Sequence, residues 1–347
     1  MTRETVMARQ PRGKYIHPQQ SQIVHTVTRC VRGAYLCGTD KATKRNYEHR
    51  RVWIQERLAF LAAGFGIDCL TFSVMSNHVH IILRSRPDLV RRWSNREVAE
   101  RWVQLCPNRD GALPEREEIS RLAKLPDKIA EIRLRLSDIS WWMRLLTQTI
   151  AKRANKENGC RGRFWEGRYK AQLLTDETAI LACTMYVDLN PVRATMADSL
   201  ENSYFTGAKL RLDNLNRNQP NTRKRRVNGE TNLLGKHLSN EPGKPWLSPI
   251  RLKRFAKLPD HSNSGLKNDR QRKGFLTMSE AEYLALTDWT GRQSRSDKRG
   301  RIPKNILPVL ENLEIDCDRW IEINRKFRAL FRKGSGISIS LASTNAA

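Results

Sequence analysis

The chain has 347 residues, and its 63 lysines and arginines outnumber its 36 aspartates and glutamates, which gives a formal net charge of +27. Hydrophobic residues make up 39% of the chain, enough for a folded core, so a wholly disordered protein is excluded. The length suggests two domains or one domain with large insertions, and the positive charge indicates a polyanionic partner, with nucleic acid expected before an acidic membrane surface.

The sequence carries no signal for a membrane or for secretion. No stretch approaches the ~18–20 apolar residues that a membrane-spanning helix needs, and no apolar segment follows the basic residues 1–15. The seven cysteines form no CxxC pair, and their odd number argues against a disulfide framework or a zinc knuckle. We therefore expect a protein of the reducing cytoplasm.

Three elements are expected within the first 90 residues. The β-branched run at 23–28 is typical of a strand. Residues 47–65 space apolar side chains along one helical face and predict a helix. The dense apolar run at 67–83 predicts a buried strand, which Pro87 ends.

The middle of the chain is predicted to be mostly helical. Residues 91–137 look inserted, because they hold two mixed-charge helical stretches that we expect to be solvated. An apolar stripe over 141–154 predicts a longer helix. A further helix is expected from an N-cap at Thr175 to about Leu189, and Pro191 must stop or bend it.

The C-terminal part divides into three stretches. Residues 208–275 are polar and basic and predict a disordered linker. Residues 276–333 regain helical spacing and predict a small helical region. The last residues, 334–347, are expected to be a frayed tail.

The motif His78-Val79-His80 lies in a predicted strand. Residues i and i+2 of a strand point to the same face, so the two imidazoles form a pair of potential ligands for a divalent cation. The alternative is a pair of unrelated strand histidines, one of them satisfied by a hydrogen bond in the core.

Tyr186 and Asn190 are four residues apart and share a helical face if the helix reaches Asn190. A tyrosine hydroxyl can attack phosphorus and form a covalent intermediate, and an amide oxygen is a hard ligand for Mg²⁺ or Mn²⁺. In the alternative, Tyr186 is an amphipathic core residue, and Asn190 is an N-cap before the N1 proline Pro191.

Cations and aromatic rings alternate over 162–170, GRFWEGRYK. Such residues meet phosphates and stack bases in proteins that bind nucleic acids. In the alternative, the rings fill the core of a strand and the cations are solvated; both descriptions fit one core-anchored strand with a basic outer face. With neighbouring cations, the candidate nucleic-acid-binding residues are Arg144, Lys152, Arg153, Lys156, Arg161, Arg163, Trp165, Arg168, Lys170 and Arg193.

Three motifs together resemble a known family. MSNHVHIIL at 75–83, GRFWEGRYKAQLL at 162–174 and YVDLNPVRA at 186–194 occur in this order. Over about residues 14–207 the sequence resembles the REP-associated tyrosine transposases, a branch of the single-tyrosine HUH transposases of bacterial insertion sequences. The resemblance implies an α/β fold (an α+β sandwich) whose antiparallel central sheet carries the HxH motif between flanking helices. The resemblance extends to TDWTGRQSRSDKRG at 287–300, whereas the long segment from Pro87 to about Arg161 and the length of chain after residue 207 depart from the minimal family pattern.

The resemblance also implies a chemistry. His78 and His80 would bind Mg²⁺ or Mn²⁺, with Asn190 as a third ligand. Tyr186 would attack a phosphodiester of single-stranded or hairpin DNA near palindromic repeats, leaving a 5′-phosphotyrosine and a 3′-hydroxyl that can rejoin the DNA. The protein would work in the bacterial cytoplasm, associated with the nucleoid, as a monomer or a homodimer.

Three other functions are compatible with the same residues. A domesticated relative would bind hairpin DNA without cutting it. A basic surface with aromatic residues also suits an RNA-binding regulator. A metal-dependent hydrolase that uses the HxH pair plus a carboxylate would form no covalent protein–DNA adduct.

Overall fold

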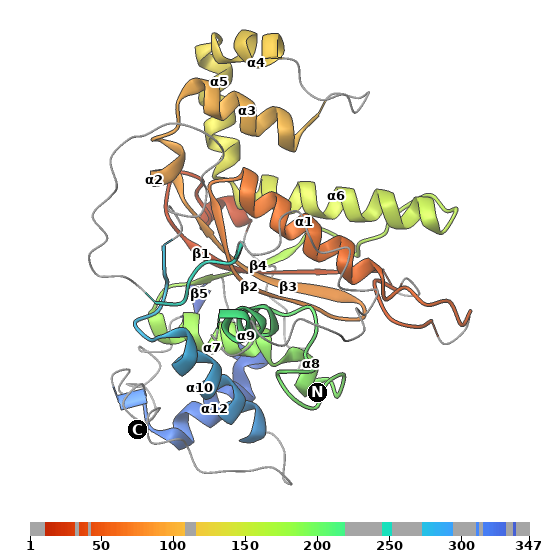
Figure 1. Ribbon diagram of the computed structural model, residues 1–347, viewed down its shortest axis with the longest axis vertical. Helices are drawn as coiled ribbons and strands as arrows, with labels where there is room; N and C mark the ends of the chain where they lie inside the picture. The colour runs from red at the N-terminus through yellow and green to blue at the C-terminus, as the bar shows by residue number, and fades with distance from the viewer. Residues whose placement is uncertain are drawn as a thin grey trace, which may run out of the picture.

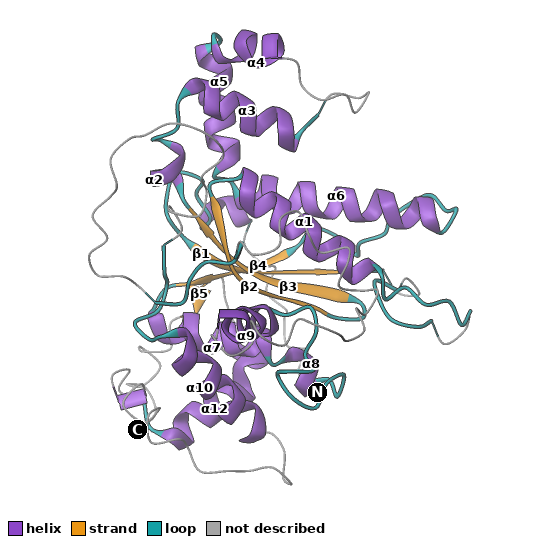
Figure 2. Ribbon diagram, viewed as in Figure 1, coloured by secondary structure: helices purple, strands orange, loops and turns teal. Residues whose placement is uncertain are grey.

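A computed structural model shows a central β-sheet covered by helices on both faces (Figures 1 and 2). This arrangement confirms the predicted α/β class, an α+β sandwich around an antiparallel sheet. The residues that the structure describes are 11–31, 35–40, 43–107, 116–218, 245–251, 273–293, 310–311, 315–330 and 336–337.

The sheet has the strand order β2-β3-β1-β4-β5. Its strands, preceded by the 3-10 turn η1 (Arg12–Lys14), are β1 (Ile23–Arg29), β2 (Ile67–Val74), β3 (His78–Ser85), β4 (Lys170–Leu174) and the short β5 (Gly336–Ile337). The first four strands pair antiparallel, and β5 runs parallel to β4. The HxH motif therefore opens an inner strand, β3.

The run at 67–83, predicted as one buried strand, is a hairpin formed by β2 and β3. The chain turns at Ser76 and Asn77, and the Met75 N–H donates to the His78 carbonyl across 2.9 Å. Helices cover both faces of the sheet, so nearly every residue of both strands is buried and no alternation marks the break. Ser76 and Asn77, residue types that are common in turns, are the only local indication of this turn in the sequence of the hairpin.

One face of the sheet is covered by α1 (Arg50–Gly64) and α6 (Ile139–Glu157), which lie above it in Figure 1. Leu58 of α1 and Trp142 of α6 are fully buried and share a core cluster with Ile81 of β3. The two helices predicted at 47–65 and over 141–154 are both confirmed.

The insertion forms α2 (Pro87–Val90), α3 (Asn95–Leu105), α4 (Arg116–Ala123) and α5 (Pro126–Leu136). It is helical as predicted, but the expected solvation is wrong for α3 and α5. Val98, Ile132 and Leu136 are buried in the same core cluster as α1 and α6. The mixed charge belongs to the outer faces of helices whose inner faces are apolar.

The other face of the sheet packs against the second group of helices. These are α7 (Glu177–Asp188), α8 (Asn190–Arg193), α9 (Gly207–Asn218), α10 (Glu280–Gln293) and α12 (Cys317–Leu330). Side chains of α7, α10 and α12 share a second core cluster with Leu70 of β2 and Ile82 of β3. Among the described helices, none is both long enough and apolar enough to cross a membrane.

The disordered linker predicted at 208–275 is wrong where the structure describes that stretch. Helix α9 covers its start, and Arg211 of α9 donates to the carbonyls of Leu70 and Ser248, both at 2.7 Å. Ala208, Leu212 and Leu215 of α9 pack against the second core cluster at helical spacing i, i+4 and i+7, but this short apolar face begins a long polar and basic stretch that masked it. Residues 219–244 and 252–272 of the predicted linker lie outside the described residues.

The predicted helical region at 276–333 contains α10 and α12, which pack against α7 and α9. The tail expected at 334–347 to be frayed instead adds the short strand β5 to the sheet edge. The rest of that tail lies outside the described residues.

Candidate active site

Two imidazoles lie together at the start of β3, on the face that packs against α7. The rings of His78 and His80 have centroids 4.8 Å apart at an angle of 73°. His80 is 5% exposed and His78 is half-buried. Strand alternation predicts this shared face, and it leaves both rings within reach of one bound cation.

His78 is oriented by the residue before it. Its Nδ1 lies 2.6 Å from the amide oxygen of Asn77, which can only accept a hydrogen bond. The neutral His78 ring therefore carries its proton on Nδ1 and its lone pair on Nε2, the form that a metal ligand needs.

A third imidazole, that of His25 in β1, contacts His80. His25 Nε2 lies 2.9 Å from His80 Nδ1, and the two rings stack with centroids 5.1 Å apart. Complete burial lowers the pKa of His25 to about 3, so this ring is neutral at pH 7. A neutral His25 can accept the Nδ1 proton of His80, which leaves the His80 lone pair on Nε2.

Sequence reasoning missed His25. It lies in the strand predicted at 23–28, but only the register of β1 against β3 brings it beside His80. The same register places Arg29, an exposed cation, directly opposite His78.

Tyr186 approaches the histidines from α7. Its ring is perpendicular to that of His80, at 83°, with centroids 5.7 Å apart. The helix that holds it begins at the N-cap Asp176, whose side chain accepts from the Ala179 N–H at 2.7 Å; the predicted cap, Thr175, lies one residue too early. Ten of the twelve residues of α7 are buried, and Tyr186 is one of the two that are not. The helix therefore holds the Tyr186 ring beside the histidine cluster.

Asn190 follows α7 and is the first residue of α8. Its side chain is 8% exposed, and its amide group donates to the Val187 carbonyl at 3.5 Å. The N-cap of α8 is Leu189, with no side-chain capping bond, so the alternative role of Asn190 as an N-cap is not realised. Its role as a metal ligand stays a prediction.

Arg193 brings positive charge to Tyr186. Its guanidinium carbon lies 5.2 Å from the centre of the Tyr186 ring. It also donates to the Asn324 carbonyl of α12 at 3.0 Å. Burial lowers the pKa of Arg193, and Tyr186 opposes that shift.

The C-terminal extension forms the outer wall of the site. Phe327 of α12 packs against Tyr186 with ring centroids 5.0 Å apart. Sequence reasoning assigned no role to Phe327 or Asn324, because an amphipathic helix near the end of a chain does not reveal what it covers.

The two oriented imidazole nitrogens are potential donors to a divalent cation, and the amide oxygen of Asn190 is of the ligand type that Mg²⁺ and Mn²⁺ prefer. Among the described residues, no three His, Cys, Asp or Glu side chains are grouped so that they could hold a metal.

The predicted nucleic-acid-binding residues divide between the two faces of the sheet. Lys170 and His80 both lie opposite Val27 of β1, so Lys170, like Arg193, is on the face of Tyr186. The cations of α6 lie on the opposite face (Figure 1): Arg144, Lys152, Arg153 and Lys156. The sheet separates these two groups.

The segment 162–169, predicted as a strand, is a loop before β4 with one isolated bridge from Trp165 to Cys30. Trp165 is 9% exposed, and its indole N–H donates to the Thr147 carbonyl of α6 at 2.9 Å. The ring anchors the loop and is largely covered, and its contact with nucleic acid stays a prediction. The exposed cations of this region are Arg161, Arg163 and Arg168.

Comparisons with known proteins do not assign this chain to a family. No protein-family model and no curated protein matches the sequence. The chain is similar to the solved structure of a REP-associated tyrosine transposase bound to a REP hairpin, with a TM-score of 0.33 and 12% sequence identity. That alignment covers 59% of this chain and 84% of the other. A similarity of this size assigns neither a family nor a function to this chain.

Proposed function

We propose that this protein is a DNA transposase-like nuclease that nicks and rejoins single-stranded or hairpin DNA through a covalent bond to Tyr186. The observation that carries the proposal is the position of Tyr186, whose ring centre lies 5.7 Å from that of His80 in the oriented His78–His80 pair. The motif resemblance over 75–83, 162–174 and 186–194 points to the same chemistry.

The metal would be Mg²⁺ or Mn²⁺, held by His78, His80 and Asn190. When bound, it would polarise the scissile phosphate and offset its negative charge. His25 and Asn77 keep the two imidazoles in the tautomers that present a lone pair.

Tyr186 is the nucleophile. Its oxygen forms a bond to phosphorus while the bond from phosphorus to the 3′ oxygen breaks, so the 5′ end stays attached to the protein. The departing oxygen takes up a proton and becomes a 3′-hydroxyl. The guanidinium of Arg193 favours negative charge on Tyr186 as the phenol loses its proton.

One tyrosine cuts one strand, and the covalent bond stores the energy of the phosphodiester. A 3′-hydroxyl can therefore reverse the reaction and rejoin DNA without a nucleotide cofactor. The exposed cations Arg29 and Lys170 lie on the same face of the sheet as Tyr186, where they suit contacts with the DNA backbone.

The test is strand cleavage of end-labelled DNA with added Mg²⁺ or Mn²⁺, comparing single strands, hairpins and perfect duplexes. We expect nicking of unpaired or hairpin DNA, lost in His80→Ala and kept in His17→Ala, a histidine outside the cluster. Comparable nicking of a perfect duplex, or full activity in His80→Ala, would contradict the proposal. Binding of hairpins without any cut would instead identify a domesticated, non-cutting DNA-binding protein.

A further inference from the structure

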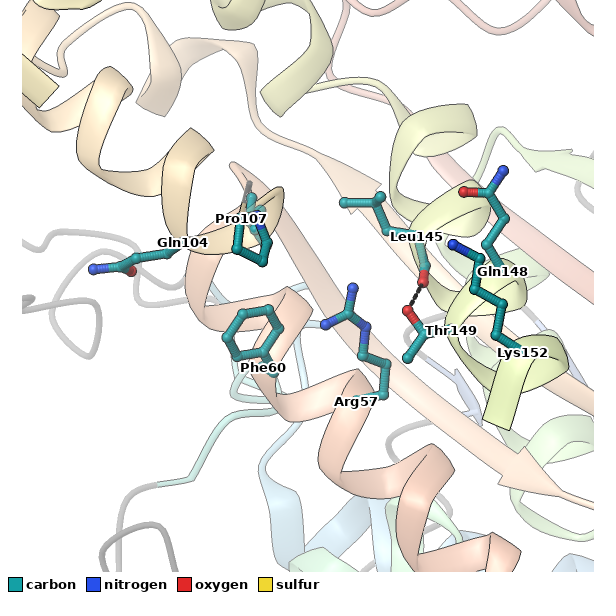
Figure 3. A pocket seen from close by; sticks show the side chains of 9 residues that line it. Arg57, Phe60, Gln104, Pro107, Leu145, Gln148, Thr149 and Lys152 are labelled. Carbon is teal, nitrogen blue, oxygen red and sulfur yellow. Dashed lines mark hydrogen bonds between the residues drawn. The ribbon is translucent and has the colours of Figure 1, made fainter. Parts of the chain in front are cut away.

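A groove lies on the face of the sheet opposite Tyr186, between α1, the end of α3 and α6 (Figure 3). Its volume is about 320 Å³. Arg57 and Phe60 line it from α1, Pro107 follows α3, and Thr149 and Lys152 line it from α6. No aspartate or glutamate is among its lining residues.

Arg57 points into this groove and has no counter-charge. Within the described residues, no carboxylate and no hydrogen-bond acceptor contacts its guanidinium, and its Nε is buried and unpaired. Arg57 itself is half-buried, whereas the buried arginines Arg50 and Arg101 are paired, with Glu157 at 2.6 Å and with Glu97 at 2.9 Å. Burial also lowers the pKa of Arg57, and the neighbouring Cys106 opposes that shift.

The remaining lining complements that cation. The guanidinium carbon of Arg57 lies 4.9 Å from the ring centre of Phe60, which is 41% exposed. Figure 3 shows Lys152 on the facing helix and Thr149 between the two cations, with the Thr149 hydroxyl donating to the Leu145 carbonyl at 2.7 Å. Two cations and an exposed ring are contacts that the phosphates and bases of a nucleic acid use.

The cations continue beyond the groove along α6. Arg144, Lys152 and Lys156 are exposed on one helical stripe and have no carboxylate partner among the described residues. The first and last are about 18 Å apart along the helix, at ~1.5 Å per residue. Arg153 stacks 3.8 Å above Trp53 of α1 on the same side. One DNA strand carries a phosphate every ~3.4 Å, so this stripe spans about five phosphates.

The geometry points to a second DNA-binding site in this groove and along α6, which holds the phosphate backbone of a hairpin stem away from the scissile phosphate. The choice of DNA as the polyanion rests on the proposed function. Because the sheet lies between the helix layer that lines the groove and the helix layer that carries Tyr186, with the two layers on the order of 20 Å apart at ~10 Å per packing step, the phosphates bound here belong to a different part of the DNA. The protein therefore grips duplex on one face and cuts unpaired DNA on the other.

The test compares hairpin-DNA affinity in a Tyr186→Phe background, so that cleavage does not affect binding. The groove variant is Arg57→Gln with Lys152→Gln. The matched control is Arg96→Gln with Lys128→Gln, which removes the same charges from residues already paired with Glu100 and Glu131. Dissociation constants are measured at several salt concentrations between ~50 and ~200 mM. Affinity falls over this range because salt weakens phosphate contacts, and a variant that has lost two such contacts should show a fall about tenfold smaller than that of the parent.

The inference predicts that tenfold reduction in the groove variant and none in the control. Equal salt dependence in the two variants, no hairpin binding by the parent chain, or tighter binding of the same hairpin as RNA would each overturn it. If Arg57→Gln lowers the unfolding temperature, Lys152→Gln alone carries the test, with an expected change of about threefold. If the parent chain never cuts DNA but the groove variant loses hairpin binding, the proposed DNA-binding groove is supported and the proposed nuclease activity is refuted.

Discussion

Acid should destabilise this protein through His25. The pKa of this ring is about 3 in the folded chain, because it is completely buried, against ~6.5 for an exposed histidine in the unfolded chain. Between these values the unfolded chain binds a proton that the folded chain does not. Stability is therefore complete above pH ~6.5 and falls as the pH falls toward 3.

The size of the effect follows from the two pKa values. At about pH 4.5, two units below the unfolded value, the loss is about 3 kcal/mol, at ~1.36 kcal/mol per unit. A loss of that size is a large part of the ~5–15 kcal/mol by which most domains are stable. It continues to grow down to the folded pKa of about 3.

Urea unfolding at about pH 7.5 and about pH 4.5 measures this loss. The parent chain is compared with His25→Gln, which keeps a polar group beside His80 but does not titrate, and with the control His17→Gln. We expect the free energy of unfolding to drop by about 3 kcal/mol more in the parent and the control than in His25→Gln. Equal drops in all three proteins would refute the account of His25 as a buried neutral ring.

Substitutions at three further positions test the structure around the site. Asp188→Ala should cost at least ~3 kcal/mol in urea unfolding, and Asp188→Asn less, because the buried carboxylate accepts from Thr71 at 2.6 Å and Tyr283 at 2.5 Å; equal stability of the parent and the alanine variant would contradict this. Gly207→Ala should also destabilise, since its Cβ would overlap the Thr71 hydroxyl and lie 3.1 Å from Thr71 Cα; an unchanged unfolding temperature would show that the contact relaxes. Asn190→Ala should weaken Mn²⁺ binding by ~10-fold or more in calorimetry while the fold is kept, and unchanged affinity would remove Asn190 from the ligand set.

Much of the fold could be predicted from local patterns. The strand at 23–28, the helix at 47–65 and the shared face of the HxH pair follow from residue type and spacing alone, and all three are found. The β2–β3 turn was hidden because both strands are buried on both faces. Helix α9 was missed because its apolar face, formed by Ala208, Leu212 and Leu215, lies at the start of a long polar and basic stretch.

The parts of the site that sequence reasoning missed depend on long-range pairing. His25 meets His80 through strand register across 55 residues, and Phe327 reaches Tyr186 through helix packing across the C-terminal extension. The motifs around His78 and Tyr186 contain no trace of either contact. The division of the cations between two faces also needs the topology, since α6 and α7 are close in sequence but lie on opposite sides of the sheet.

The central claim is that Tyr186 forms a bond to DNA. The most direct measurement is mass spectrometry of proteolytic peptides after incubation of the protein with hairpin or single-stranded DNA and Mn²⁺. The account predicts a nucleotide attached through a 5′ phosphate to the peptide that contains Tyr186, absent in Tyr186→Phe and retained in Tyr204→Phe, whose tyrosine is 61% exposed. Cleaved DNA with no covalent peptide, or an adduct on another residue, would contradict it.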